Sequence, residues 1–146
     1  MPGTRRNAPA TDHGIEVDEL AVMLAVQLEG KGDDMGARSL LAGVEGSKGL
    51  LERGYLHLAS GEVVPGRGNL RKAVSGLPPT EATDVISLLG LLEELKGEAL
   101  VVVMRNAVLE HQGQASFAVS EIKTLIGGIP LADQPAVLAY SARIAD

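Results

Sequence analysis

The glycines of this chain are concentrated in its middle, and their distribution limits where long helices can form. Ten of the 18 glycines lie between Gly30 and Gly68. Each glycine in a helix interior costs about 1 kcal/mol relative to alanine, so this region favours short helices, turns and loops. We therefore expect continuous helices before and after the middle, with a more broken structure between them.

Apolar residues recur at helical spacing on both sides of the glycine-rich middle. A stripe of five such residues predicts a helix from Ile15 to about Gly30. This stripe consists of Val17, Leu20, Ala21, Leu24 and Leu28. Further helices are predicted over 80–96, 98–110, 117–126 and from Asp133 onwards. These patterns predict a mainly α protein, a compact helical domain of five or six helices.

The middle of the chain is predicted to contain one interrupted helix. Residues 37–53 carry a helical apolar pattern, but Gly43, Gly46 and Gly49 interrupt it. We expect a shortened or distorted helix that ends before Gly54. The alternative is that these glycines allow the backbone of another helix to approach closely.

Two short runs in the middle are predicted to form a β-hairpin. Residues 55–59 alternate apolar and polar character, and a Ser-Gly pair separates them from 62–64. This order favours a hairpin over about 55–64, and the composition of 65–69 predicts a loop. Residues 99–104 are rich in β-branched side chains. We expect this segment to be helical, and the fold would be α+β if it were a strand.

The chain is predicted to form one domain preceded by a polar tail. Residues 1–14 lack periodicity and apolar content, which predicts a disordered tail. A boundary is expected at 76–79, because the two prolines there interrupt regular structure. It separates an N-terminal helical and hairpin segment, 15–75, from a C-terminal helical segment, 80–146. Since 146 residues correspond to a domain of ordinary size, we expect both segments to share one compact domain.

Composition and charge exclude several classes of protein. The absence of cysteine excludes a disulfide scaffold and a cysteine metal site. The net charge of −6, from 13 basic and 19 acidic residues, argues against a basic surface over the whole protein. No apolar run approaches the roughly 20 residues that cross a bilayer, and no signal-peptide pattern is found. We therefore expect no contact with a membrane and predict a cytoplasmic location.

Residues that could carry out catalysis are sparse. The three histidines, His13, His57 and His111, are far apart, and no two have the spacing of metal ligands on one helix. We interpret each of them as a structural or surface residue. Because no nucleophile motif is found either, the sequence predicts no cofactor and no metal and gives no support to an enzyme.

Four apolar residues lie off the predicted core-facing stripes. Val22, Met23 and Val26 widen the apolar surface of the first helix, and Leu91 interrupts the polar face of the helix over 80–96. A helix that is apolar all round is usually buried, which favours a central core position for the first helix. The alternative is an interface with a second chain. The leading functional hypothesis is therefore a non-catalytic helical interaction or self-assembly protein, as a homo-oligomer or with a protein partner.

Three cations lie close together in the predicted loop and just after it. Arg67, Arg71 and Lys72 could bind the phosphate of a nucleotide or a nucleic acid. The predicted order of helix, strand, turn, strand and basic loop over 37–72 resembles the recognition helix and wing of winged-helix DNA-binding domains. This resemblance covers roughly residues 15–72 and implies a DNA-binding regulator as the alternative function.

Overall fold

The computed structural model describes residues 18–145, and within them the chain forms eight α-helices. The first occupies residues 18–30. The others are α2 (Asp34–Leu41), α3 (Ser47–Ala59), α4 (Val63–Ala73), α5 (Pro79–Glu94), α6 (Gly97–His111), α7 (Ala115–Leu125) and α8 (Gln134–Ala145). Two short 3₁₀ helices, η1 (Val74–Gly76) and η2 (Ile126–Gly128), follow α4 and α7. The tail predicted for residues 1–14 lies outside the described residues.

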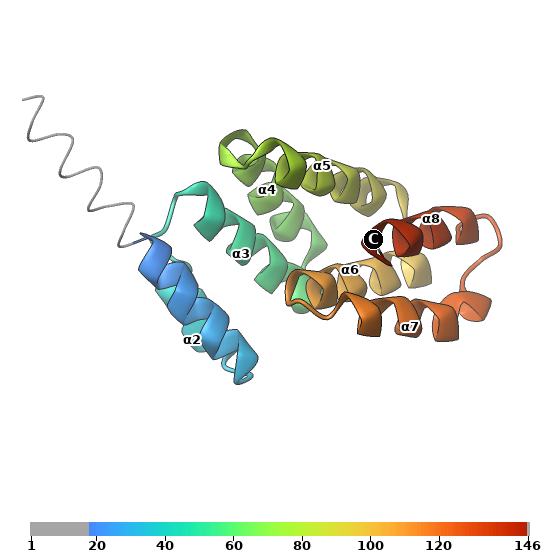
Figure 1. Cartoon of the computed structure of the whole chain (residues 1–146), viewed down its shortest axis with the longest axis horizontal. Helices are drawn as coiled ribbons and strands as arrows, with labels where there is room; N and C mark the ends of the chain where they lie inside the picture. Colours follow the sequence, from blue (N-terminus) through green and yellow to red (C-terminus); the bar gives the residue numbers. More distant parts are fainter. Residues whose placement is uncertain (1–17, 146) are drawn as a thin grey trace, which may run out of the picture.

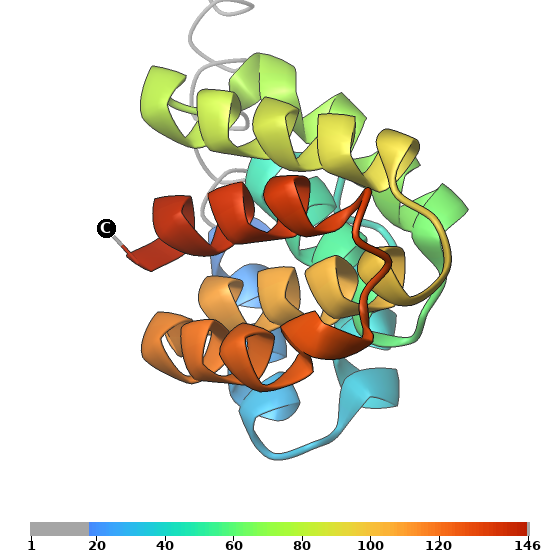
Figure 2. The ribbon, with the colours of Figure 1, turned by 90° about the vertical axis from the view of Figure 1, so that its right-hand side faces the viewer.

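Successive helices pack as antiparallel pairs in an elongated molecule (Figure 1). The helix at 18–30 and α2 form the pair at one end, and α7 and α8 form the pair at the other. Seen from the second end, α5, α8, α6 and α7 lie above one another in that order (Figure 2). We call the helix at 18–30 together with α2 the N-terminal pair.

The interior is divided into two apolar clusters of unequal size. The main core joins all helices from α3 to α8, and its fully buried side chains include Leu70, Leu92, Val103 and Ile122. A smaller cluster lies between the N-terminal pair and α3. It consists of Ala25, Ala37, Leu41, Val44 and Leu56. Helix α3 contributes to both clusters and therefore stands between them.

The predicted hairpin over 55–64 is wrong, because these residues belong to two helices. Residues 55–59 form the last turns of α3, and α4 begins at Val63. Tyr55 and Leu58 face the main core whereas Leu56 faces the smaller cluster. Burial on two sides puts apolar residues on opposite faces of α3, which imitates the alternation of a strand. The Ser-Gly pair does form a turn, with Gly61 at φ 78°, but this turn joins two helices.

The loop predicted over 65–69 is also wrong, since it lies inside α4. Gly66 faces Gly54 of α3, and a Cβ atom at Gly54 would lie 3.2 Å from the carbonyl oxygen of Gly66. These two glycines allow close approach of the α3 and α4 backbones. The helix predicted over 37–53 is interrupted after Leu41 and resumes at Ser47, and it continues past Gly54 instead of ending before it.

The predicted fold class is confirmed, and the finer details are corrected. The described residues are mainly helical and contain no strand, and 99–104 lies within α6, so the α+β alternative is wrong. Eight α-helices over 18–145 exceed the predicted five or six. The additional ones arise where a single interrupted helix and a hairpin were expected.

No helix among residues 18–145 is long and apolar enough to span a membrane.

Candidate functional site

A carboxylate and an imidazole are paired between α3 and α6. Glu52 is almost completely buried, although carboxylates rarely are, and its Oε1 lies 2.5 Å from Nε2 of His111. The ring of His111 stacks on Tyr55, with ring centroids 3.9 Å apart and planes inclined by 10°. Glu52 and Tyr55 are three residues apart on α3, so one helix face fixes the imidazole from two directions.

Glu29 adds a second carboxyl group to this pair, from the last turn of the helix at 18–30. Burial raises its pKa from 4.5 to about 7, and the neighbouring charge of Glu52 adds to this shift. Hydrogen bonding with Glu52 and the charge of Asp34 also raise the pKa of Glu29, whereas the charge of His111 lowers it. Within the described residues, the buried Oε2 of Glu29 has no hydrogen-bond partner.

A hollow of about 290 Å³ lies beside these three groups. Its remaining lining residues are Val26, Gly30, Gln112 and Gln114. With its pKa raised to about 7, Glu29 can exchange a proton near neutral pH. Among residues 18–145, no group of three or more His, Cys, Asp or Glu side chains is placed to hold a metal ion.

A second, smaller hollow of about 200 Å³ lies on the main-core side of Tyr55. It is lined by Tyr55 and Tyr140 together with Asp84, Glu110 and Arg143. Burial raises the pKa of both tyrosine hydroxyls, so both remain protonated at neutral pH. The Arg143 guanidinium lies 5.4 Å from the centre of the Tyr140 ring, within the range of a cation–π contact.

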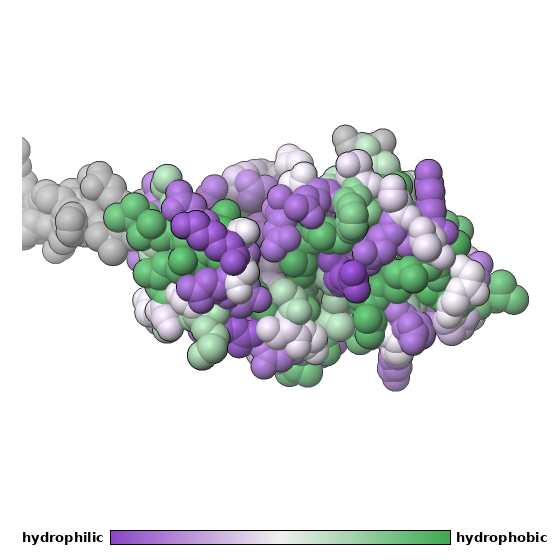
Figure 3. All heavy atoms as spheres, turned by 90° about the horizontal axis from the view of Figure 1, so that it is seen from below, coloured by the Kyte–Doolittle hydropathy of each residue, from purple (hydrophilic) through white to green (hydrophobic). Residues whose placement is uncertain are grey.

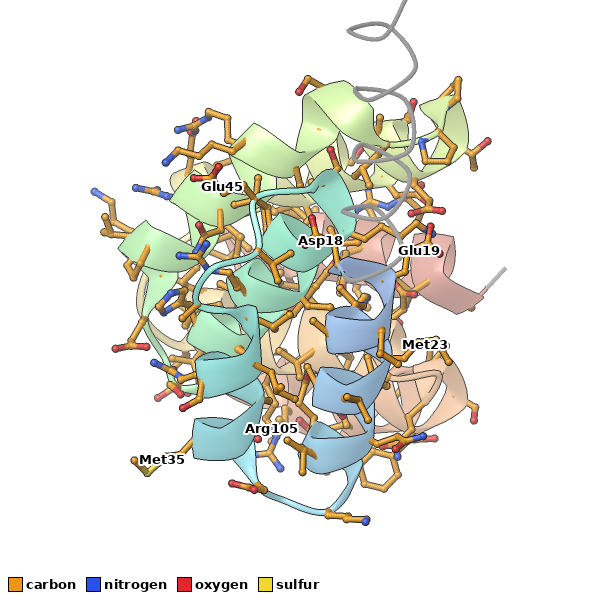
Figure 4. All side chains as sticks on the ribbon, turned by 90° about the vertical axis from the view of Figure 1, so that its left-hand side faces the viewer. Asp18, Glu19, Met23, Met35, Glu45 and Arg105 are labelled. Carbon is orange, nitrogen blue, oxygen red and sulfur yellow. The ribbon has the colours of Figure 1, made fainter. Side chains whose placement is uncertain are left out.

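The helix at 18–30 turns large apolar side chains toward solvent. The exposed fractions are 55% for Leu20, 61% for Met23, 41% for Leu24 and 48% for Val26. We call these four residues the outer face. Figure 4 looks onto this end of the molecule and shows Met23 of the first helix and Met35 of α2 projecting outward. Figure 3 shows hydrophobic atoms at the same end, next to the grey atoms.

The buried side of this helix differs from the predicted one. Leu20 and Leu24 were expected to face the core, but the side that packs inward carries Ala21, Val22, Ala25 and Leu28. Ala25 is completely buried. Large residues occur on both sides of the helix, so apolar periodicity alone does not distinguish the two orientations.

The four predicted interface residues lie in different surroundings. Met23 and Val26 belong to the outer face, and Val26 also lines the hollow. Val22 is partly buried against the smaller cluster, and Leu91 is partly buried against the main core. The structure therefore brings Met23 and Val26 together and separates Leu91 from them.

The three predicted phosphate-binding cations all lie on α4, and two of them contact α5. Arg67 is half-buried and donates to the carbonyl oxygen of Leu92 at 3.5 Å. Arg71 forms an ion pair with Glu93, and Lys72 is exposed. Because the described residues contain no strand, the wing of a winged-helix domain has no counterpart here.

Sequence reasoning did not find the Glu29–Glu52–His111 cluster. Its members are far apart in the chain and come from three different helices, so no spacing connects them. His111 was interpreted as a structural or surface residue at a helix end, and the structure places it against Glu52. His57 bonds to Glu62, which also pairs with Arg38 of α2, whereas His13 lies outside the described residues.

Comparisons with protein-family models, with curated proteins and with solved structures find no match for this chain. Its function must therefore be inferred from its own residues.

Proposed function

We propose that this protein is a non-catalytic helical interaction protein that binds another protein through its outer face. The observation that carries this proposal is the orientation of the helix at 18–30. This helix buries Ala25 completely and leaves the side chains of Leu20, Met23 and Leu24 exposed by 41% or more. If this helix were rotated so that Leu20, Met23 and Leu24 faced inward, the isolated chain would bury more apolar surface.

A partner that covers the outer face would gain free energy from burying its apolar side chains. Covering a half-exposed aliphatic side chain completely contributes roughly 1 kcal/mol, so the four residues together supply a useful share of a moderate affinity. Exposed apolar residues scattered singly need no explanation, but four on consecutive turns of one helix form a continuous strip. Such a strip is what helix-in-groove and helix-on-helix recognition uses.

A second apolar surface offers a competing location for the interface. It is a groove of about 390 Å³ between the end of α3 and α6, where Val101 is exposed. The DNA-binding alternative has less support, because Arg67 and Arg71 already contact α5. A comparison of variants at the outer face and in the groove distinguishes the two protein interfaces.

The test is a capture experiment with surface variants that keep the fold. Tagged wild-type protein and the Leu20→Asp/Leu24→Asp double variant are compared as baits, with Leu138→Asp as the matched control. Leu138 lies on α8 and is 49% exposed, which is close to the exposure of the two outer-face leucines. We expect a protein that binds wild type and Leu138→Asp but not the double variant.

The same variants test self-assembly and the competing groove. Light scattering across a concentration series shows whether wild type associates with itself and whether the double variant stays monomeric. Loss of the captured protein with Val101→Asp, but not with the double variant, would place the interface in the groove. Identical capture by all baits, with a monomer at every concentration, would contradict the proposal.

A further inference from the structure

We infer that the partner is a basic amphipathic helix, and that one of its lysine or arginine side chains lies against Glu29 at the hollow. The apolar stripe of this helix would cover the outer face. This inference rests on the proposed function, because it names the chemistry of the partner that the outer face would bind.

The first support is the negative charge of the segment that carries the outer face. Residues 18–46 contain six acidic residues and two basic ones, which gives this segment a charge of −4 in a protein of net charge −6. Arg38, one of the two basic residues, is already paired with Glu62 at 2.8 Å. The partner surface with complementary charge is therefore basic.

The second support is the position of these charges relative to the apolar strip. Asp18 and Glu19 lie at the beginning of the helix at 18–30 (Figure 4), and Glu29 lies in its last turn. Asp33 and Asp34 follow at the start of α2. Carboxylates thus lie before and after an apolar strip that is about 9 Å long from Leu20 to Val26, given a rise of about 1.5 Å per residue. A helix with apolar residues at i, i+3, i+4 and i+7 and with cations beside them matches this pattern.

The third support is the hollow beside the strip. Val26 belongs both to the outer face and to the lining of the hollow, so a helix on the outer face passes next to it. Glu29 and Glu52 place two carboxyl groups there against one imidazole, and the buried Oε2 of Glu29 lacks a hydrogen-bond donor. An ammonium or guanidinium group supplies both the missing donor and a positive charge.

The same charges argue against two other occupants of this face. A second copy of the chain would bring two segments of charge −4 together, which costs free energy unless cations lie between them. Nucleic acid would be repelled for the same reason. A basic helix is the occupant that satisfies both the apolar strip and its acidic surroundings.

Binding of a cation at Glu29 has a characteristic dependence on pH. Glu29 holds a proton at slightly acidic pH, since its pKa is raised to about 7. The groups that face it are Glu52 from α3, His111 from α6 and Asp34 from α2. A cation favours the ionised carboxylate, so the complex releases this proton and its affinity rises from about pH 6 to about pH 8.

The experiment uses a fluorescent peptide of about 14 residues, four helical turns, with leucine at i, i+3, i+4 and i+7 and lysine elsewhere. The control peptides have the same composition in scrambled order, or glutamine in place of lysine. Fluorescence anisotropy is measured at about 0.1 M salt with wild type, Leu20→Asp/Leu24→Asp, Leu138→Asp and Glu29→Gln. Circular dichroism confirms that each variant is folded.

We expect wild type and Leu138→Asp to bind the leucine–lysine peptide equally, and the double variant to bind it at least about tenfold more weakly. Glu29→Gln should retain binding, with an affinity that no longer rises with pH. Equal binding of the scrambled peptide would overturn the inference, because it would show charge attraction without helix recognition. An unchanged rise with pH in Glu29→Gln would overturn the placement of the cation.

The outcomes separate this inference from the proposed function. Binding of the glutamine peptide in preference to the lysine peptide, with loss in the double variant, would overturn the basic partner and leave the outer face as an interface. The same conclusion would follow if no peptide bound but the double variant still failed to capture a protein that wild type captures. Failure of both experiments would contradict the proposed function itself.

Discussion

The N-terminal pair and the main core differ in the size of the side chains that they bury. The main core encloses its large side chains, and Leu70, Leu92 and Ile122 are less than 2% exposed. The N-terminal pair completely buries two alanines, Ala25 and Ala37, and one leucine, Leu41, whereas the four large residues of the outer face are exposed. Under the proposed function, apolar residues stabilise the fold in one region and would bind a partner in the other.

The two regions also differ in how they are held. The helices of the main core are joined by a continuous apolar cluster. The N-terminal pair is attached by a small cluster and by polar contacts at two places, the Arg38–Glu62 pair and the Glu29–Glu52–His111 cluster. A small cluster yields less stabilisation, so we expect the N-terminal pair to open more readily than the rest.

The largest expected effect comes from a cavity in the main core. Leu92→Ala should lower the free energy of unfolding by about 3 kcal/mol, because a fully buried leucine leaves unfilled space. Leu41→Ala removes an equally buried leucine from the smaller cluster. Urea unfolding with hydrogen exchange should show faster exchange for Leu41→Ala mainly in residues 18–41. Equal acceleration over the whole chain in both variants would break the distinction between the two regions.

The next effect concerns the close approach of α3 and α4 within the main body. A Cβ at Gly54 would lie 2.7 Å from Leu70 and 3.2 Å from the Gly66 carbonyl oxygen, so Gly54→Ala should destabilise by about 2 kcal/mol. Gly68 on α4 has open space around its Cβ position and is the control. Gly68→Ala should stabilise by up to about 1 kcal/mol. Thermal unfolding measures both, and a neutral Gly54→Ala would show that the helices can separate without cost.

A smaller effect is expected from pH at the junction of the two regions. The pKa of Glu29 is raised from 4.5 in the unfolded chain to about 7 in the folded one, so the folded state binds an extra proton between these values. The stabilisation is present at low pH and is lost as pH rises through about 7. Because Glu29 is only partly buried and is screened by solvent, we expect a loss of about 1 kcal/mol from about pH 5 to about pH 8.

Comparison with Glu29→Gln isolates this effect from other titrating groups, including Glu52, His111 and Asp34. The difference in unfolding free energy between wild type and variant should shrink or change sign as the pH rises. A constant difference between pH 5 and pH 8 would mean that Glu29 does not take up a proton on folding.

The smallest effect is expected at the outer face. Leu24→Ser should lower the free energy of unfolding by no more than about 1 kcal/mol, because its side chain is 41% exposed and lies off the buried side of the helix. The same change at Leu41 should destabilise strongly. Chemical denaturation of both variants provides the measurement. A large loss with Leu24→Ser would show that the outer face contributes to folding instead of recognition.

The sequence predicts the helices after Pro79 well, because each has one buried side and clear end signals. Helix α6 was recovered over 99–104 despite its β-branched residues, since its flanks favour a helix. The sequence predicts a strand where α3 continues beyond Gly54. This part of α3 is buried on two sides, so its apolar residues do not recur with the helical period of 3.6 residues. The reading of Gly66 as a loop residue failed because its role depends on Gly54 of another helix.

The candidate site was less accessible to sequence reasoning than the fold. Met23 and Val26 were predicted as interface residues because they lie off the apolar stripe. The orientation of that helix depends on which side fits against α2 and α3, and this is a property of packing. The Glu29–Glu52–His111 cluster depends on contacts between three helices, which no local pattern records.

The position of α3 between the two clusters has a consequence for dividing this protein into fragments. A chain shortened to begin at Ser47 would uncover Leu56, which is 2% exposed, and would remove Glu29 from the neighbourhood of Glu52. The boundary between the N-terminal pair, which would bind the partner, and the main core therefore runs along α3. It does not coincide with a linker. We therefore expect that neither part folds as an independent module, and that a minimal version of this protein retains both sides of α3.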